Sequence, residues 1–148
     1  MAMTIGFLFN HDRLHQIAHT APIAAEVVAE GVDVSILCSS AEQEHRVRAL
    51  IPPGMPVQFV RLTTSRLANI VNSLTGGVIP FRRLGLLRKN LPVFSSFDAL
   101  VVPETTSTLL KSRYGLNALK LIYMPQGAGD RSLGFRGVHR MFYLALLL

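Results

Sequence analysis

Short apolar runs that alternate with helical patterns constrain the fold of this chain most strongly. The first run is MTIGFLFN, and similar runs recur as VDVSILCSS, VQFVRL, FDALVVPE and ALKLIYMP. Continuous apolar runs of this length are typical of parallel strands, which are buried on both faces. Because helical patterns separate the runs, the sequence predicts an α/β fold, a Rossmann-like parallel sheet with helices on both faces.

Residue spacing between these runs predicts the helices. A helical pattern over residues 12–30 contains Pro22, which predicts either a kink or a helix that begins there. Ser39 and Glu42 have the spacing of a capping box for a helix that ends near Leu50. The segment TTSTLLKSRYG predicts a short helix with a threonine N-cap. A further helix is predicted by apolar residues at i, i+3, i+4 and i+7, namely Leu67, Ile70, Val71 and Leu74.

The composition is that of a globular protein. Apolar residues make up 49% of the chain and charged residues 16%, which excludes a disordered chain and indicates a large core. No apolar run approaches the ~20 residues needed to cross a bilayer. Cys38 is the single cysteine, so an internal disulfide framework is excluded and a cytoplasmic location is predicted.

Positive charge is concentrated in one part of the chain. The net charge is +6, and no acidic residue stands between Glu44 and Asp98. Such a field favours an anionic partner, whether a phosphorylated substrate, an acidic lipid surface or nucleic acid, although a solubilising surface has the same composition. The basic residues of this interval are Arg46, Arg48, Arg61, Arg66, Arg82, Arg83, Arg88 and Lys89.

One stretch, PFRRLGLLRK, combines leucines with the last four of these cations, Arg82, Arg83, Arg88 and Lys89. A helix between Pro80 and Pro92 could place the leucines in a membrane surface and the cations against lipid phosphates. The alternative is a helix of the domain with a basic outer face. Nucleic acid is not predicted as a partner, because no recognisable nucleic-acid-binding motif is present.

Four polar segments are predicted to meet at one edge of the sheet. In open parallel sheets, ligands bind outside the carboxyl ends of the strands. The segments that follow predicted strands are residues 10–13, Ser39–Ser40, Glu104–Thr106 and residues 126–131. Thr105 is therefore a candidate ligand-binding residue.

Common cofactor motifs are missing from the sequence. It has no G-x-G-x-x-G after the first strand, no G-x-x-x-x-G-K-[ST] and no G-x-S-x-G, and no cofactor is predicted. His11, His15 and His19 would share one helical face, but Asp12 is the one carboxylate near them, so no metal site is predicted. We expect His11 at the strand edge as a polar ligand, a base or a capping residue, and the other two histidines at the helix surface.

The loop MPQGAGDRSLGF follows the fifth predicted strand. Gly127 and Gly129 allow positive φ angles and a close approach of the backbone to a ligand. Free amides in such a loop bind anions, and Arg131 could bind phosphate oxygens through its guanidinium group. Asp130 could orient Arg131, accept a proton or cap the next helix. The alternative is an ordinary turn between a strand and a helix.

Two segments resemble a known family. LIYMPQGAGDRSLGF, taken with TIGFLFNHDRLHQIAHTAPIAAEVVAEGVDVSILCSS, resembles the N-terminal lobe of GT-B-type glycosyltransferases, and most closely the CDP-glycerol glycerophosphotransferase-like branch. These bacterial enzymes transfer sugar or polyol-phosphate units to envelope acceptors. Two alternatives stay open, a UDP-N-acetylglucosamine 2-epimerase-like lobe and a non-catalytic Rossmann-like module that binds a phosphorylated ligand or a partner.

The resemblance implies roles for several residues. His11 would line the acceptor side of the cleft, and His11 or Asp130 would accept the proton of the attacking hydroxyl. Gln126 stands where the family places a candidate histidine base, and glutamine cannot exchange a proton as histidine does. The surrounding pattern is matched by Gly127, Gly129, Asp130 and Arg131. The residues expected to bind the charged group are Gln126, Gly127, Gly129 and Arg131.

The resemblance also implies partners and an arrangement of domains. A nucleotide-activated sugar or polyol donor would bind mainly to a second, C-terminal lobe. An anionic or lipid-linked acceptor would bind to this one, near the inner face of the cell membrane. Residues 1–137 are expected to form the acceptor-side lobe, and residues 138–148, which include FYLALLL, the start of an apolar helix. The chain is therefore expected to be a truncated product or one lobe of a larger assembly.

Overall fold

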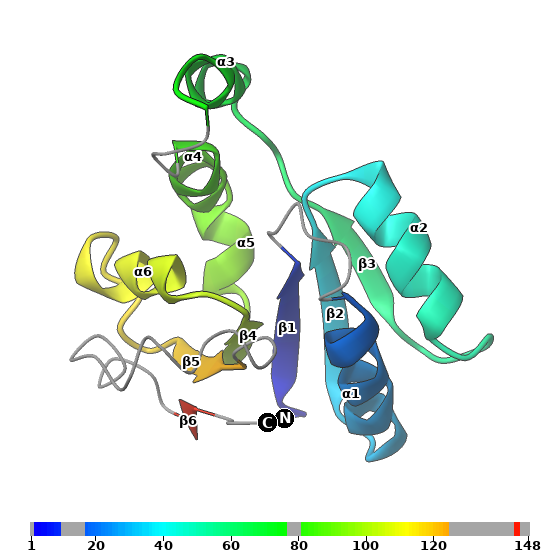
Figure 1. Ribbon diagram of the computed structural model, residues 1–148. Coiled ribbons are helices and arrows are strands. Elements are labelled where there is room, and N and C mark those ends of the chain that lie inside the picture. The colour runs from blue at the N-terminus through cyan, green and yellow to red at the C-terminus, as the bar shows by residue number, and fades with distance from the viewer. Residues whose placement is uncertain (1, 10–16, 77–80, 125–143, 146–148) are drawn as a thin grey trace.

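A six-stranded sheet forms the centre of the computed structural model, which describes residues 2–9, 17–76, 81–124 and 144–145 (Figure 1). The strand order is β3-β2-β1-β4-β5-β6, and every neighbouring pair is parallel. The predicted Rossmann-like parallel sheet is confirmed. The strands are β1 (Thr4–Phe9), β2 (Asp33–Cys38), β3 (Gln58–Arg61), β4 (Ala99–Val102), β5 (Lys120–Tyr123) and β6 (Leu144–Ala145).

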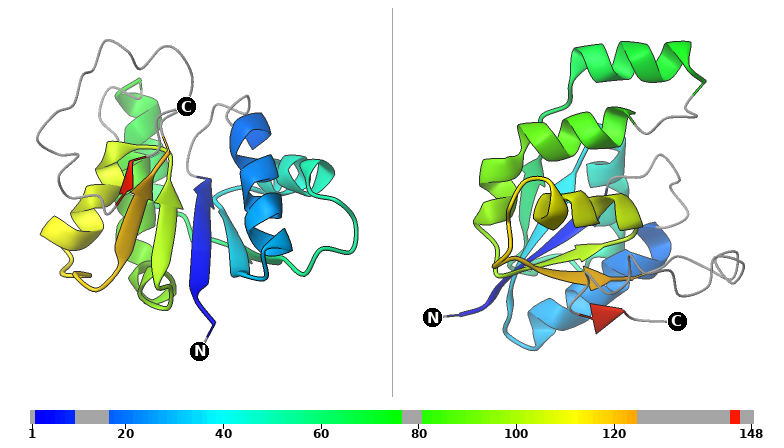
Figure 2. Two further views of the ribbon diagram at one scale, coloured as in Figure 1. Left: turned by 90° about the horizontal axis from the view of Figure 1, so that it is seen from below. Right: turned by 90° about the vertical axis from the view of Figure 1, so that its left-hand side faces the viewer.

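Helices cover both faces of the sheet, as the sequence predicts (Figures 1 and 2). The helices α1 (Ile17–Ala29) and α2 (Ala41–Leu50) pack on one face. The other face is covered by α4 (Phe81–Lys89), α5 (Leu91–Ser95) and α6 (Leu109–Ser112), the last preceded by the 3-10 turn η2 (Thr105–Thr108). The helix α3 (Arg66–Leu74) packs on α4 and lies farther from the sheet than α4 does.

Two hydrophobic cores lie on opposite faces of the sheet. Along β1, Phe7 belongs to the core under α1 and α2, whereas Leu8 belongs to the core under α4, α5 and α6. Ile36 and Leu37 divide in the same way on β2. Successive side chains of a strand point to opposite faces, so a strand buried on both faces needs an unbroken apolar run.

The structure corrects two predicted helix starts. The N-cap of α2 is Ser40, whose hydroxyl accepts the Gln43 N–H at 3.2 Å. The capping box predicted for Ser39 and Glu42 is thus wrong by one residue, because the chain is still extended at Ser40 (φ −146°, ψ 159°). A helix beginning at Pro22 is wrong as well, since Pro22 lies inside α1.

The predicted threonine N-cap divides between α6 and the turn that precedes it. The turn η2 has Glu104 as its N-cap, because Glu104 is extended (φ −148°, ψ 161°) and its carboxylate accepts the Thr106 N–H at 2.6 Å. The N-cap of α6 itself is Thr108, a threonine as predicted, but its side chain makes no capping hydrogen bond. An aspartate, serine or threonine is the usual cap. Here the longer glutamate side chain performs this role from within the domain, where it is buried.

The stretch between Pro80 and Pro92 forms part of the domain core. Leu86 and Leu87 of α4 are fully buried, and Asn90 separates α4 from α5. These two leucines are therefore committed to the domain core, as in the alternative of a domain helix. Whether Arg88 and Lys89 contact a membrane is a separate prediction, and both are exposed on α4.

The strand β6 falls in the segment for which the sequence predicts the start of a helix. Leu144 and Ala145 pair in parallel with Ile122 and Tyr123 of β5. A short apolar run is compatible with either a helix or a buried strand, and pairing with β5 decides in favour of a strand for these two residues. The other residues of 138–148 lie outside the described part.

Candidate functional site

The order of the strands defines where a ligand site is expected. From β1 the chain proceeds outward to β2 and β3, and then crosses to β4 on the other side of β1. In such sheets, ligands bind at the carboxyl ends of the two strands between which the order reverses. Here those strands are β1 and β4, whose registered pairs include Phe7 and Val101.

Glu104 lies just past the carboxyl end of β4, at this switch point. It is only 7% exposed. One carboxylate oxygen accepts the Thr106 N–H at 2.6 Å, and the other accepts the Ser107 hydroxyl at 2.5 Å. Each carboxylate oxygen has a second lone pair, so Glu104 can still accept a hydrogen bond from a ligand. Thr105, the predicted ligand-binding residue, follows it and is half-buried.

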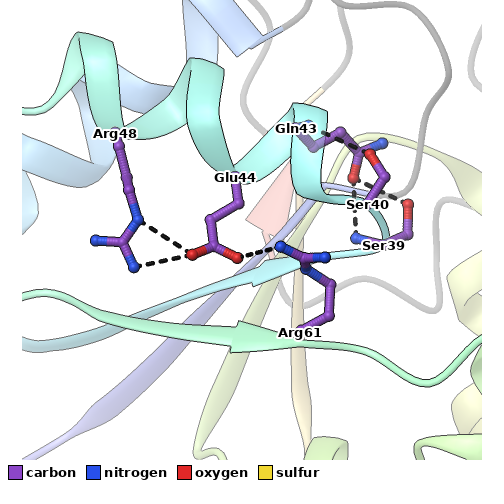
Figure 3. A network of polar contacts seen from close by, with 6 residues as sticks. All are labelled: Ser39, Ser40, Gln43, Glu44, Arg48 and Arg61. Carbon is purple, nitrogen blue, oxygen red and sulfur yellow. Dashed lines mark hydrogen bonds and ion pairs between the residues drawn. The ribbon is translucent and has the colours of Figure 1, made fainter.

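The polar residues that follow β2, Ser39 and Ser40, form their side-chain hydrogen bonds with Gln43 of α2 (Figure 3). The side-chain oxygen of Gln43 accepts both the N–H and the hydroxyl of Ser39, each at 2.9 Å. Ser39 and Gln43 are both buried. The predicted edge segment Ser39–Ser40 does follow β2, but its hydroxyls are used to join β2 to α2.

A carboxylate held by two arginines lies beside this group (Figure 3). Glu44 of α2 accepts from Arg48 at 2.9 and 3.1 Å and from Arg61, the last residue of β3, at 2.6 Å. Hydrogen bonds from Arg61 and then Arg48 hold the pKa of Glu44 below its ordinary value. The Arg48 guanidinium also lies 3.8 Å from the centre of the Phe59 ring, so these charges fasten α2 to β3.

The cations of the acid-free interval thus divide into two groups. Arg46 pairs with Glu42 at 3.2 Å, and Arg48 and Arg61 pair with Glu44. The others lie on α3 and α4, which contain no acidic residue. Of these, Arg66, Arg88 and Lys89 are exposed, and an anionic partner for them remains a prediction.

Cys38 is unsuited to nucleophilic chemistry despite its place at the carboxyl end of β2. It is 1% exposed. Burial raises the pKa of its thiol to about 12, with a smaller contribution from Glu44. Because the thiolate is the reactive form, a neutral, buried Cys38 serves as a small apolar side chain of the core.

Most of the predicted site residues lie outside the described residues: His11, Gln126, Gly127, Gly129, Asp130 and Arg131. The structure does bring the chain to the expected edge at both places. The strand β1 ends at Phe9, and β5 ends at Tyr123, which pairs with Val102 at the end of β4. The roles of these six residues remain predictions, and Thr105 is the ligand-binding candidate that the structure positions.

Of the three histidines of the predicted helix, one lies within the described residues. His19 lies exposed on α1, as predicted, whereas His11 and His15 lie outside the described part. Within the part of the chain that the structure describes, no three histidine, cysteine, aspartate or glutamate side chains gather closely enough to hold a metal ion.

Sequence reasoning placed Glu104 at the edge but did not select it as a site residue. Its signal is weak, because a glutamate after an apolar run is also an ordinary helix-start residue. Gln43 was not singled out at all. Its burial depends on the tertiary contact between α2 and β2, which no local pattern reveals.

No protein-family model matches the chain, and no curated protein matches it. Among the described residues, no helix has the length and apolar character required to cross a membrane. The fold and the polar edge of the sheet are therefore the observations on which a function can be proposed.

Proposed function

We propose that this chain is the acceptor-side lobe of a GT-B-type transferase of bacterial envelope polymer synthesis, similar to the CDP-glycerol glycerophosphotransferase-like branch. The proposal is supported most by the switch point between β1 and β4. Buried Glu104 and half-buried Thr105 lie there, and the segments that hold His11 and Arg131 start from the same edge.

The proposed reaction is displacement at a donor's anomeric carbon or phosphorus atom by an acceptor hydroxyl. The donor is a nucleotide-activated sugar or polyol bound mainly by a second lobe, and the acceptor is anionic or lipid-linked. His11 or Asp130 takes the hydroxyl proton, while Arg131 and the amides of Gly127 and Gly129 balance the developing charge. The site of action is the cytoplasmic face of the cell membrane.

Ligand titration of the ¹⁵N-labelled chain, followed by NMR, tests the proposed acceptor site. Glycerol 3-phosphate represents a polyol-phosphate chain end. We expect its addition to shift the amide signals of Thr105 and Thr106, because these residues follow β4 at the switch point. Thr105→Val should weaken this binding about three- to ten-fold, the effect of losing one hydrogen bond. Thr75→Val, the same change at the end of α3, is the matched control.

Other outcomes would separate the alternatives. A chain that binds UDP-N-acetylglucosamine at this edge, and not glycerol 3-phosphate, would favour the epimerase-like lobe. Binding of several unrelated phosphorylated ligands with equal affinity would favour a non-catalytic module. If none of these ligands shifts a signal at the carboxyl edge, the proposed site is wrong.

A further inference from the structure

The helix α3 exposes a stripe of large apolar side chains. Leu67 is 72% exposed, Ile70 57% and Leu74 81%, and half-buried Val71 completes the i, i+3, i+4, i+7 pattern. We call these four residues the α3 stripe. The other large apolar side chains that are exposed in the described part, Met3 and Leu50, belong to other segments. A contiguous exposed stripe, unlike isolated residues, marks an interaction surface.

Packing against α4 explains why the α3 stripe faces outward. A Cβ atom at Gly85 of α4 would lie 2.9 Å from Ala68 Cβ and 3.2 Å from Ser65 Cβ. The small residues of the α3 segment are therefore the ones pressed against α4, and the absence of a side chain at Gly85 permits the close approach. The α3 stripe lies on a different part of the helix surface, and α3 is the outermost helix at this side of the molecule (Figures 1 and 2).

Exposed basic residues lie on both α3 and α4. Arg66 precedes Ile70 by four residues and so neighbours it on the helix surface. On α4, Arg88 and Lys89 follow Gly85 by three and four residues and are exposed on the side of the helix that carries the α3 contact. Neither helix contains an acidic residue, so no internal carboxylate on them offsets this charge.

We propose that the α3 stripe docks on an anionic lipid surface, with the leucines among the acyl chains and the exposed cations Arg66, Arg88 and Lys89 at the lipid phosphates. Amphipathic helices that combine an apolar stripe with flanking lysines and arginines bind in this way. The inference rests on the membrane-side location proposed above. It differs from the sequence prediction because the inserting side chains come from α3, whereas Leu86 and Leu87 of α4 are in the domain core.

Docking through α3 would also place the candidate site near the lipid surface. The helix α3 follows the carboxyl end of β3 by a short connection, residues 62–65. It therefore starts at the same edge of the sheet as Glu104 and Thr105. A lipid surface bound by the α3 stripe would bring the head groups of lipid-linked acceptors toward this edge.

Vesicle flotation with the full chain, in the absence of donor and acceptor, tests the inference. We expect binding to phosphatidylcholine vesicles that contain phosphatidylglycerol, and weak binding to phosphatidylcholine alone. Each cation near an anionic surface adds about five-fold to affinity, so Arg88→Gln combined with Lys89→Gln should weaken binding on the order of 25-fold. Arg46→Gln, on α2, is the matched control and should bind as the wild type does.

A second variant tests the contribution of the apolar side chains to vesicle binding. Leu67→Gln combined with Leu74→Gln should lower binding about ten-fold or more. Both residues are exposed, so the fold should persist, which circular dichroism checks. Leu50→Gln changes an exposed leucine of α2 and should leave binding unchanged.

Three results would overturn the inference. One is equal binding to neutral and anionic vesicles, and another is unchanged binding of the Leu67→Gln, Leu74→Gln variant. The third is self-association in sedimentation velocity without lipid that this variant abolishes, since the α3 stripe would then bind a second copy of the chain. Failure here leaves glycerol 3-phosphate binding unaffected, so the two proposals fail separately.

Discussion

The carboxamide of Asn90 makes three hydrogen bonds at the junction of α4 and α5. Its oxygen accepts the Thr63 N–H at 2.9 Å, and its nitrogen donates to the carbonyls of Thr63 and Leu86, each at 2.8 Å. The residue is 3% exposed. One side chain thus holds the connection from β3 to α3 against α4, and it supplies both the donor and the acceptor that the Thr63 backbone needs.

Asn90→Asp should destabilise the protein strongly. A carboxylate has the same shape but cannot donate to the two carbonyls, and it would be buried beside them. We expect a loss of about 2–4 kcal/mol in the free energy of unfolding, measured by urea denaturation. Asn117→Asp, at an exposed position, should change it by less than about 0.5 kcal/mol. Equal unfolding midpoints for the two variants would show that the Asn90 contacts contribute little.

Asp98 makes the structure sensitive to acid. Its carboxylate accepts the Thr4 N–H at 2.8 Å and the Thr4 hydroxyl at 3.0 Å, which joins the start of β1 to the residue before β4. The backbone bond first, and then the hydroxyl bond, hold the pKa of Asp98 below its ordinary value. Because the pKa is lower in the folded state, the interaction stabilises the protein above about pH 4 and is lost as the pH falls through the folded-state pKa.

Asp98→Asn should therefore reduce the difference in the stability of the protein between neutral and acidic pH. We expect the wild type to exceed the variant in unfolding midpoint at pH 7 and to lose this advantage as the pH falls through the folded-state pKa of Asp98. The lowered pKa of Glu44 also makes stability fall in acid, but that effect is common to both proteins and cancels. Asp33→Asn, at the exposed start of β2, is the control. If the unfolding midpoints of the wild type and Asp98→Asn differed by the same amount at all pH values, the ionisation of Asp98 would not contribute to the acid sensitivity.

Among the helices, α3 and α4 approach each other closely at Gly85. Gly85 gives α4 a surface without a side chain, and Ala68 and Ser65 fill that space. Glycine is costly inside a helix, by about 0.5–1 kcal/mol relative to alanine. Its presence in α4 is explained by this approach, since a Cβ atom there would lie too close to the Ala68 methyl group.

A double-mutant cycle tests this contact. Gly85→Ala should destabilise the protein, and the loss should be smaller when Ala68→Gly removes the opposing methyl group. We expect a coupling energy of about 0.5–3 kcal/mol between the two sites, measured from urea unfolding. Ala49→Gly, at an exposed position on α2, should show no coupling with Gly85→Ala. Additivity at Gly85 and Ala68 would contradict the packing described here.

At the scale of the whole molecule, the parallel arrangement concentrates the candidate chemistry at one edge. All strands point the same way, so Ser39, Glu104 and Met124 leave the sheet together at its carboxyl edge. The opposite edge carries structural contacts such as Asp98 with Thr4. The α3 stripe starts from the carboxyl edge as well, which links the proposed acceptor site to the proposed lipid surface.

Much of this edge could be predicted from the sequence, because the carboxyl ends of parallel strands lie at the same edge of the sheet, whatever the order of the strands. Thr105 was placed after β4 correctly on that basis. The exact caps could not be predicted, since Ser39 and Ser40 offer equivalent hydroxyls and only the end of β2 decides between them. Gln43 was missed because a polar residue in a helix gives no local sign that it is buried.

The sequence by itself determined the α/β class, because apolar runs of strand length alternate with helical patterns, and strands with such unbroken runs are covered on both faces. Helical periodicity likewise determined that α3 has one apolar side. It could not determine what that side contacts, because a stripe facing a core and a stripe facing outward have the same spacing. Tertiary packing decided it. Gly85 admits Ala68 and Ser65 against α4, and this leaves Leu67, Ile70 and Leu74 exposed.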